Sequence, residues 1–181
     1  MSTPQTPVIP HQVDEPAELD FSSPQGDDFD ALSRDRIPVR SMTEADLEAL
    51  TAIDRRATEQ DRSAYYRRKH RETLYEAGVR VSLVAELDDH PVGFIMARVD
   101  FGEFGHTESE AVMDTIGVDP GYRERGVGRA LMSQLIANLA TLRVDHIRTE
   151  IDWNDVGLIS YLGELGFEPA QCVALSRPLT E

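Results

Sequence analysis

The chain has 181 residues, 40% of them hydrophobic, and a formal net charge of −15 at pH 7. This length suits one domain with a buried core, and the acidic balance argues against binding to nucleic acid or an anionic membrane. The sequence contains no run of about 18 apolar residues, so no transmembrane helix is expected, and its first residues lack the basic and apolar regions of a secretory signal, so we expect none. Its single cysteine, Cys172, cannot form an internal disulfide, so we expect a cytoplasmic protein.

The first 35 residues differ in composition from the rest of the chain. They contain five prolines, eight acidic residues and one base, Arg34. Such a segment cannot bury enough apolar surface to fold alone. We therefore predict that residues 1–35 are a disordered, acidic, proline-rich tail and that residues 36–181 form one folded domain.

The domain is predicted to begin with a short strand at residues 37–40. Thr43 can cap a helix because an acid, Asp46, follows three residues later, and apolar spacing continues this helix to about Ala57. A second helix is expected from about residue 61 to Gly78.

Three residues of this second helix have more than one interpretation. Its polar aromatic side chains could contact a substrate, or they could be half-buried packing residues, as such side chains often are. They are Tyr65, Tyr66 and His70.

A hairpin is expected next, with strands at residues 81–87 and 91–99 joined by a turn at Asp88, Asp89 and His90. A loose connection follows at residues 100–109. The five histidines of the chain are scattered, and no spacing of His, Cys and carboxylate residues fits a metal site.

The stretch at residues 110–141 is the most informative. An apolar strand at 110–118 ends at Asp119-Pro120-Gly121, and a helix with an apolar face is predicted from Gly126 to about Thr141. Between them lies a basic, glycine-punctuated turn. This layout can hold a phosphate group, because the free N–H groups and the dipole of a helix N-terminus attract anions.

The glycines and arginines of the turn fit this hypothesis. Gly126 and Gly128 lack side chains that would keep an anion from the backbone, and Arg123, Arg125 and Arg129 add charge. An ordinary junction with solvated arginines is the alternative. Two other phosphate motifs fail: no Lys follows Gly128, as a Walker loop requires, and Leu131 replaces the third glycine of a dinucleotide fingerprint.

The last elements are a strand at 146–152, a helix at about 155–165 and a strand at 173–176. Asn154 or Asp155 could cap the helix, and Gly166 ends it. One face of this helix is expected to carry Leu158, Ile159, Leu162 and Leu165. The order of elements predicts an α/β (α+β) domain with a mixed sheet.

The segment Arg123-Glu124-Arg125-Gly126-Val127-Gly128, with its flanks at 117–120 and 129–132, resembles the Arg/Gln-x-x-Gly-x-Gly/Ala signature of the GCN5-related N-acetyltransferases (GNAT). The resemblance covers residues 37–178. It implies a mixed central sheet of about six to seven strands flanked by about four helices, and acetyl-CoA as the acyl donor, with no metal.

The resemblance also implies the residues that bind the donor. Pyrophosphate would contact the loop and helix start, formed by Arg123, Glu124, Arg125, Gly126, Val127, Gly128 and Arg129. The pantetheine arm would pair with the central strand at Ile116 and Val118 and contact Asn154, whose alternative role is the helix cap.

For the catalytic base, several family members have a Glu on the central strand that would fall at Val112. Strand alternation predicts a common face for Glu110, Val112, Asp114, Ile116 and Val118. Asp114 and Glu110 are therefore the candidate bases, with Glu150 acting through water as an alternative.

For the catalytic acid, the family often has a Tyr on the last helix. Counting forward from Asn154 places it at Tyr161, whereas counting back from Gly166-Phe167 places it at Leu162, because the chain has one extra residue. Tyr161 is the candidate acid, and ordinary packing is its alternative.

We therefore hypothesise an N-acetyltransferase that transfers acetyl directly from acetyl-CoA to the primary amine of a protein N-terminus or a small molecule. A catalytically weak CoA- or acyl-CoA-binding regulatory module is the alternative, and another phosphate-binding protein is the third hypothesis. No nucleic acid or membrane partner is expected, and a homodimer remains open.

Overall fold

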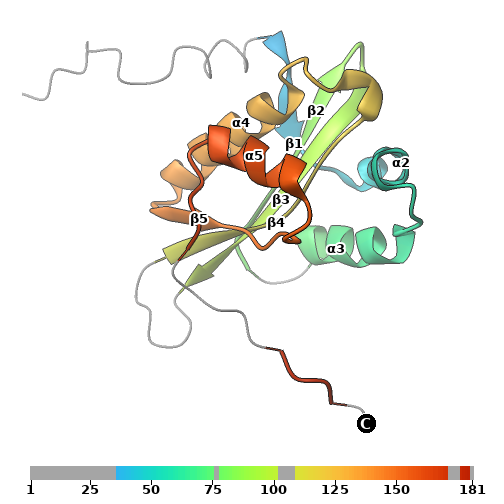
Figure 1. Ribbon diagram of the computed structural model, residues 1–181. Helices are drawn as coiled ribbons and strands as arrows, with labels where there is room; N and C mark the ends of the chain where they lie inside the picture. The colour runs from blue at the N-terminus through green and yellow to red at the C-terminus, as the bar shows by residue number, and fades with distance from the viewer. Residues whose placement is uncertain (1–35, 76–77, 102–108, 171–175, 180–181) are drawn as a thin grey trace, which may run out of the picture.

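The computed structural model describes residues 36–75, 78–101, 109–170 and 176–179 (Figure 1). The strands are β1 (Val39–Ser41), β2 (Arg80–Leu87), β3 (His90–Phe101), β4 (Ser109–Val118) and β5 (His146–Arg148). The α-helices are α2 (Leu47–Thr58), α3 (Ser63–Tyr75), α4 (Val127–Thr141) and α5 (Val156–Glu164). Two single 3-10 turns, η1 (Glu44–Asp46) and η2 (Pro120–Tyr122), precede α2 and α4.

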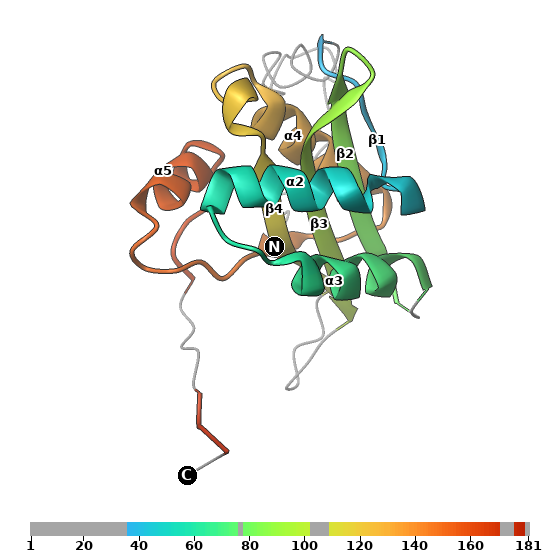
Figure 2. The ribbon, with the colours of Figure 1, turned by 90° about the vertical axis from the view of Figure 1, so that its right-hand side faces the viewer.

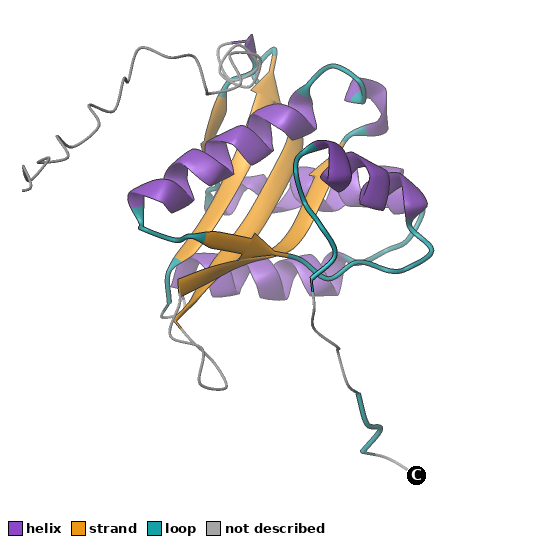
Figure 3. Cartoon of the chain, turned by 60° about the vertical axis from the view of Figure 1, so that its left-hand side comes forward, coloured by secondary structure: helices purple, strands orange, loops and turns teal. Residues whose placement is uncertain are grey.

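These elements form a three-layer arrangement around one sheet. The strands lie in the order β1-β2-β3-β4-β5, antiparallel except for the parallel pair β4 and β5. Helices α2 and α3 cover one face (Figure 2), and α4 and α5 cover the other (Figure 3). The predicted mixed α/β architecture is confirmed. None of the helices in the described residues is both long and apolar enough to cross a bilayer.

Each face of the sheet has its own apolar core. Under α4, the predicted apolar positions Val127, Leu131, Leu135 and Leu139 are all buried, so the helical period identified that face correctly. Under α2 and α3 the cluster is smaller and centres on Leu50, Ile53, Tyr66 and Phe94. Fully burying each such side chain contributes roughly 1.5–3 kcal/mol.

Two predicted strands differ in the structure. β5 ends at Arg148 rather than at residue 152, because the chain leaves β4 after Thr149, whose hydroxyl donates to the Met113 carbonyl at 3.0 Å. The strand expected at 173–176 falls largely on residues 173–175, outside the described residues, and Ser176 is not in a strand. The described part of the sheet therefore has five strands rather than six to seven.

A buried polar network joins α2 and α3 and connects them to β4. The Asp54 carboxylate, 4% exposed, accepts hydrogen bonds from Arg62 and, at 2.9 Å, from the Tyr66 hydroxyl. Burial raises the pKa of Tyr66, so the hydroxyl remains a donor. The Tyr66 oxygen also lies 3.3 Å from Thr115 Oγ1 on β4. Tyr66 is thus a packing residue, as is His70, whose Nε2 lies 2.8 Å from the Thr43 carbonyl oxygen.

A second buried carboxylate organises the start of α2. Asp46 accepts two hydrogen bonds from Arg40, both at 2.8 Å, and one from the Thr43 N–H at 2.7 Å. This confirms the predicted pairing of Thr43 with Asp46. Burial alone would raise the pKa of Asp46, but the bonds from Arg40 and Thr43 outweigh it and lower the pKa to about 2.

We expect Asp46→Asn to lower the free energy of unfolding at pH 7 by about 2 kcal/mol, since the pKa shift from 3.8 to about 2 corresponds to that amount. Because the folded-state pKa is depressed, this contribution is present above about pH 4 and is lost as the pH falls to about 2. Urea unfolding of both proteins at several pH values measures it. A stability difference that stays constant over that pH range would contradict the assignment.

Candidate functional site

The site is built around β4, which is hydrogen bonded on both edges for only its first half. On one edge, β3 pairs with β4 along its whole length. On the other, β5 pairs with β4 only from Glu110 to Val112. Within the described part of the chain, the second edge of residues 114–118 therefore has no strand partner. This half contains Ile116 and Val118, the residues at which the sequence predicted pairing with an extended ligand.

A β-bulge occurs where the pairing with β5 ends. The register against β3 shifts between the pairs Met96–Thr115 and Ala97–Met113, so Asp114 is the extra residue. Both Asp114 and Thr115 therefore contact α3, through Lys69 and Tyr66 respectively.

The bulge corrects one prediction, that five alternate residues of β4 share a face. Strand alternation continues only up to the bulge, beyond which the faces exchange. Ile116 and Val118 pack against the α4-side core, whereas Asp114 faces α3. Asp114 is therefore not on the same face as Ile116 and Val118.

The two candidate bases lie in different surroundings. Asp114, 11% exposed, forms ion pairs with Arg98 and, at 3.3 Å, with Lys69. Glu110 accepts a hydrogen bond from Arg148 at 2.7 Å, beside the paired half of β4. Asp114 is therefore the one that lies at the point where β4 becomes open.

Hydrogen bonds hold the start of the turn after β4, whereas its end, at the start of α4, has no side-chain cap from its N-cap residue. Asp119 accepts from the Gly121 N–H at 3.0 Å and from Arg56 of α2 at 2.6 Å. Glu124 and Gly126 then take left-handed conformations, with φ of 61° and 86°. Gly126 is the N-cap of α4 and provides no side-chain cap, so the N-cap residue leaves the first amides of this helix available for another acceptor.

Arginines surround this helix start. Arg123 and Arg125 are exposed, and Arg129 is half-buried on the first turn of α4. The Arg125 guanidinium lies 5.1 Å from the centre of the Tyr122 ring, which restricts its position. The predicted layout of strand, basic turn and helix N-terminus is thus present.

Gly128 has a packing role that the sequence did not predict. A Cβ at this position would lie 2.6 Å from the Tyr161 hydroxyl oxygen and 3.2 Å from Cζ. The hydroxyl is buried. The candidate acid Tyr161 therefore lies against the first turn of α4, whereas Leu162, its alternative in the sequence count, is buried in the core at 2% exposure.

The start of α5 distinguishes the two candidate caps. Asp155 is the N-cap and accepts from the Leu158 N–H at 3.0 Å. Asn154 is exposed and donates from its backbone N–H and its side chain to Asp152. Ile159, predicted on the apolar face, is 38% exposed, so that face is narrower than expected.

The structure brings most of the predicted donor-binding residues together around the open half of β4, the turn and the start of α4. The structure also places Thr115, Lys69 and Arg56 beside this region. The sequence does not predict their positions, because each is brought there by a contact with a residue distant in the chain. No cluster of three or more metal-binding side chains is found in the described ranges.

Comparison with known proteins agrees with this arrangement. The Acetyltransferase (GNAT) family profile matches residues 45–167. The chain belongs to this family. An acetyltransferase of Pectobacterium atrosepticum is 30% identical over 99 residues, a match that spans 55% of this chain and 65% of that relative.

Solved structures show the same fold. An aminoglycoside N-acetyltransferase in complex with CoA aligns with a TM-score of 0.67 at 18% identity, covering 80% of this chain and 95% of that one. The ribosomal-protein-S18-alanine N-acetyltransferase of Escherichia coli aligns with a TM-score of 0.62 at 23% identity, covering 75% and 79%.

The contact between Gly128 and Tyr161 predicts a pair of coupled substitutions. We expect Gly128→Ala to lower the free energy of unfolding by about 1–3 kcal/mol, because the methyl group overpacks the site. Tyr161→Phe should recover part of this loss by removing the closest atom.

Urea unfolding of the single and double variants measures the coupling. Gly163→Ala on α5 is the matched control, since a Cβ there meets nothing within 4 Å and should stabilise the helix slightly. Equal stabilities for the variants at 128 and 163 would contradict the contact.

Proposed function

We propose that this chain transfers an acetyl group from acetyl-CoA directly to a primary amine of a protein N-terminus or a small molecule. The observation that supports this most strongly is the open edge of β4, which runs directly into an α4 N-terminus without a side-chain cap. An extended arm with free amides can add to such an edge as a strand does, and a pyrophosphate suits the helix start.

The donor-binding residues follow from this geometry. Ile116 and Val118 offer backbone groups on the open edge. The loop and the first turn of α4 offer amides and guanidinium groups from Arg123, Glu124, Arg125, Gly126, Val127, Gly128 and Arg129. Asn154 would contact the arm from the start of α5.

Bound acetyl-CoA supplies a thioester carbonyl and a thiolate leaving group. The amine nitrogen forms a bond to the carbonyl carbon as the carbon–sulfur bond breaks, the amine proton passes to a base and the thiolate takes a proton. We assign the base to Asp114, at the bulge, with Glu110 as the less favoured candidate. We assign the acid to Tyr161, which lies beside the α4 N-terminus.

Incubation of the protein with acetyl-CoA and a panel of amines, followed by thiol release and acetylation mass shift, tests the function. The panel should include peptides with free N-termini, polyamines and amino sugars. Thermal stabilisation by acetyl-CoA with no acetylation of any amine would instead favour the regulatory module. That alternative is favoured by the ion pairs of Asp114 with Lys69 and Arg98, which already occupy its carboxylate oxygens.

The loop arginines predict a binding defect. Arg123→Ala with Arg125→Ala should weaken acetyl-CoA binding by about tenfold or more, because two charge-assisted contacts are lost. Both side chains are exposed, so the unfolding midpoint should not change. Calorimetric titration measures the affinity, Arg143→Ala is the control, and an unchanged Kd for the double variant would refute the assignment.

The assignment of Asp114 predicts a catalytic defect. Asp114→Asn should lower kcat by about a hundredfold, the usual contribution of a general base. Asp100→Asn is the matched control, since Asp100 also pairs with Arg98, at 3.3 Å, but lies away from the open half of β4. Wild-type rates across pH for the Asp114 variant would exclude it.

A further inference from the structure

Residues 55–71, which run from the end of α2 into α3, are strongly basic in an acidic protein. They contain seven of the 18 basic residues of the chain and only two acids, Glu59 and Asp61, which gives a local charge of +5. The net charge of the whole chain is −15. A concentration of positive charge on two adjacent helices is therefore a distinct feature of this surface.

Internal ion pairs account for some of these bases. Arg56 pairs with Asp119, Arg62 with Asp54, and Lys69 with Glu72 and Asp114. Arg55 and Arg67 are exposed and form no ion pair within the described residues. Both side chains line the same depression between the two helices.

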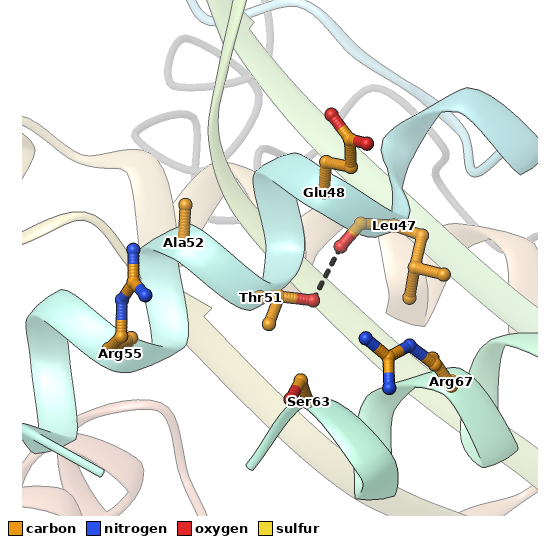
Figure 4. Close-up of a pocket in the computed structure, with 7 residues that line it drawn as sticks. All are labelled: Leu47, Glu48, Thr51, Ala52, Arg55, Ser63 and Arg67. Atoms are coloured by element: carbon orange, nitrogen blue, oxygen red, sulfur yellow. Dashed lines mark hydrogen bonds between the residues drawn. The ribbon is translucent and has the colours of Figure 1, made fainter. Parts of the chain in front are cut away.

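Arg55 and Arg67 line a depression that we call the α2–α3 groove (Figure 4). It has a volume of about 300 Å³. Its lining consists of Leu47, Glu48, Thr51, Ala52, Arg55, Ser63 and Arg67. Figure 4 shows that Arg67 reaches from α3 toward Leu47 and Thr51 of α2. The groove thus combines apolar carbon with two guanidinium groups and one carboxylate, that of Glu48, and its lining residues lie on α2 and α3 rather than on β4 and α4.

We propose that the N-terminal tail, residues 1–35, docks in the α2–α3 groove. The tail has eight acids and one base, a charge of −7, which complements the +5 of residues 55–71. Its aromatic residues lie among acids, in Glu18-Leu19-Asp20-Phe21 and in Asp27-Asp28-Phe29-Asp30. A phenylalanine fits the apolar lining of the groove, and neighbouring carboxylates fit the planar donor forks of the arginines.

The length of the tail sets how far its aromatic residues can extend from the folded domain. Phe21 precedes Ile37, the first core residue after the tail, by sixteen residues. A flexible chain of that length has an end-to-end distance of about 22 Å and extends to about 50 Å. Such a tether gives an effective concentration on the order of 1 mM, so a contact with a Kd of about 1 mM is occupied about half the time.

Docking would connect the tail to the helices that support β4. Arg56 of α2 contacts Asp119, and Tyr66 of α3 contacts Thr115. A tail bound between α2 and α3 would therefore contact both helices, each of which contacts one end of the open half of β4. This inference depends on the groove and the tail, and does not require that the protein transfer acetyl groups.

Paramagnetic relaxation in the full chain tests the proposal. Cys172→Ser and Gln25→Cys provide one thiol for a nitroxide label between the two aromatic segments of the tail. We expect the amide signals of residues 47–67 to broaden strongly, because a nearby nitroxide broadens signals even when a rapidly exchanging contact is only half occupied. Signals on α4, on the opposite face of the sheet, should keep theirs.

Charge-reversal variants provide the comparison. Arg55→Glu with Arg67→Glu should restore the signals of α2 and α3, whereas Arg143→Glu with Arg177→Glu, which changes the net charge equally at exposed sites outside the groove, should not. Phe21→Ser with Phe29→Ser changes only the tail, so it leaves the folded domain intact and should also restore the signals.

Three results would overturn the proposal. They are uniform or absent broadening in the labelled chain, broadening that persists in the groove variant, and broadening that arises between a labelled chain and a separate isotope-enriched chain in a mixed sample. The last result would assign the groove to the tail of a second copy.

Discussion

The organisation of the site depends on the point at which β5 leaves β4. Three residue pairs, from Glu110 with His146 to Val112 with Arg148, hold the two strands in parallel, and the Thr149 hydroxyl adds one contact to Met113 before the chain turns away. The bulge at Asp114 falls at the same place. The pairing of β4 with β5 therefore ends at the same place where the side chains of β4 exchange faces. One short segment thus has an open backbone edge and also directs Asp114 and Thr115 toward α3.

The open half of β4 is held in place from the side of the helices. Asp54 is buried and charged, which would be costly alone, but it is paired with Arg62 and bonded to Tyr66. Tyr66 reaches Thr115, and Arg56 reaches Asp119 at the far end of the same half-strand. Polar contacts at both ends of residues 114–118 thus hold this half of β4, which, within the described residues, has no second strand beside it. These contacts leave the open edge of β4 unoccupied.

Helices and strands with a strong hydrophobic period were predictable from the sequence. Features that depend on one extra residue in a strand, such as the β-bulge at Asp114, were not. The apolar spacing predicted the buried face of α4, and the glycine-punctuated turn after β4 was also predicted, because both are local patterns. Strand alternation placed Asp114 with Ile116, and the bulge reversed that relation because a single extra residue exchanges the faces. β5 was predicted too long because residues 149–152 continue its alternation, with Thr149 and Ile151 between the acidic Glu150 and Asp152, although no strand of the described residues lies beside them.

Gly126 and Gly128 belong to the same short sequence signature, but glycine is needed at each for a different structural reason. Gly126 takes a left-handed conformation that disfavours a side chain whatever the surroundings, and this frees the helix start. Gly128 is an ordinary helical residue whose missing Cβ leaves room for Tyr161 of α5. The first glycine is thus required by the backbone and the second by a neighbour. In this chain, alanine at the second position requires that Tyr161 move or be replaced by a smaller residue. In this chain the identity of residue 128 is therefore coupled to residue 161, the proposed acid, and α5 is positioned relative to the donor loop by direct packing.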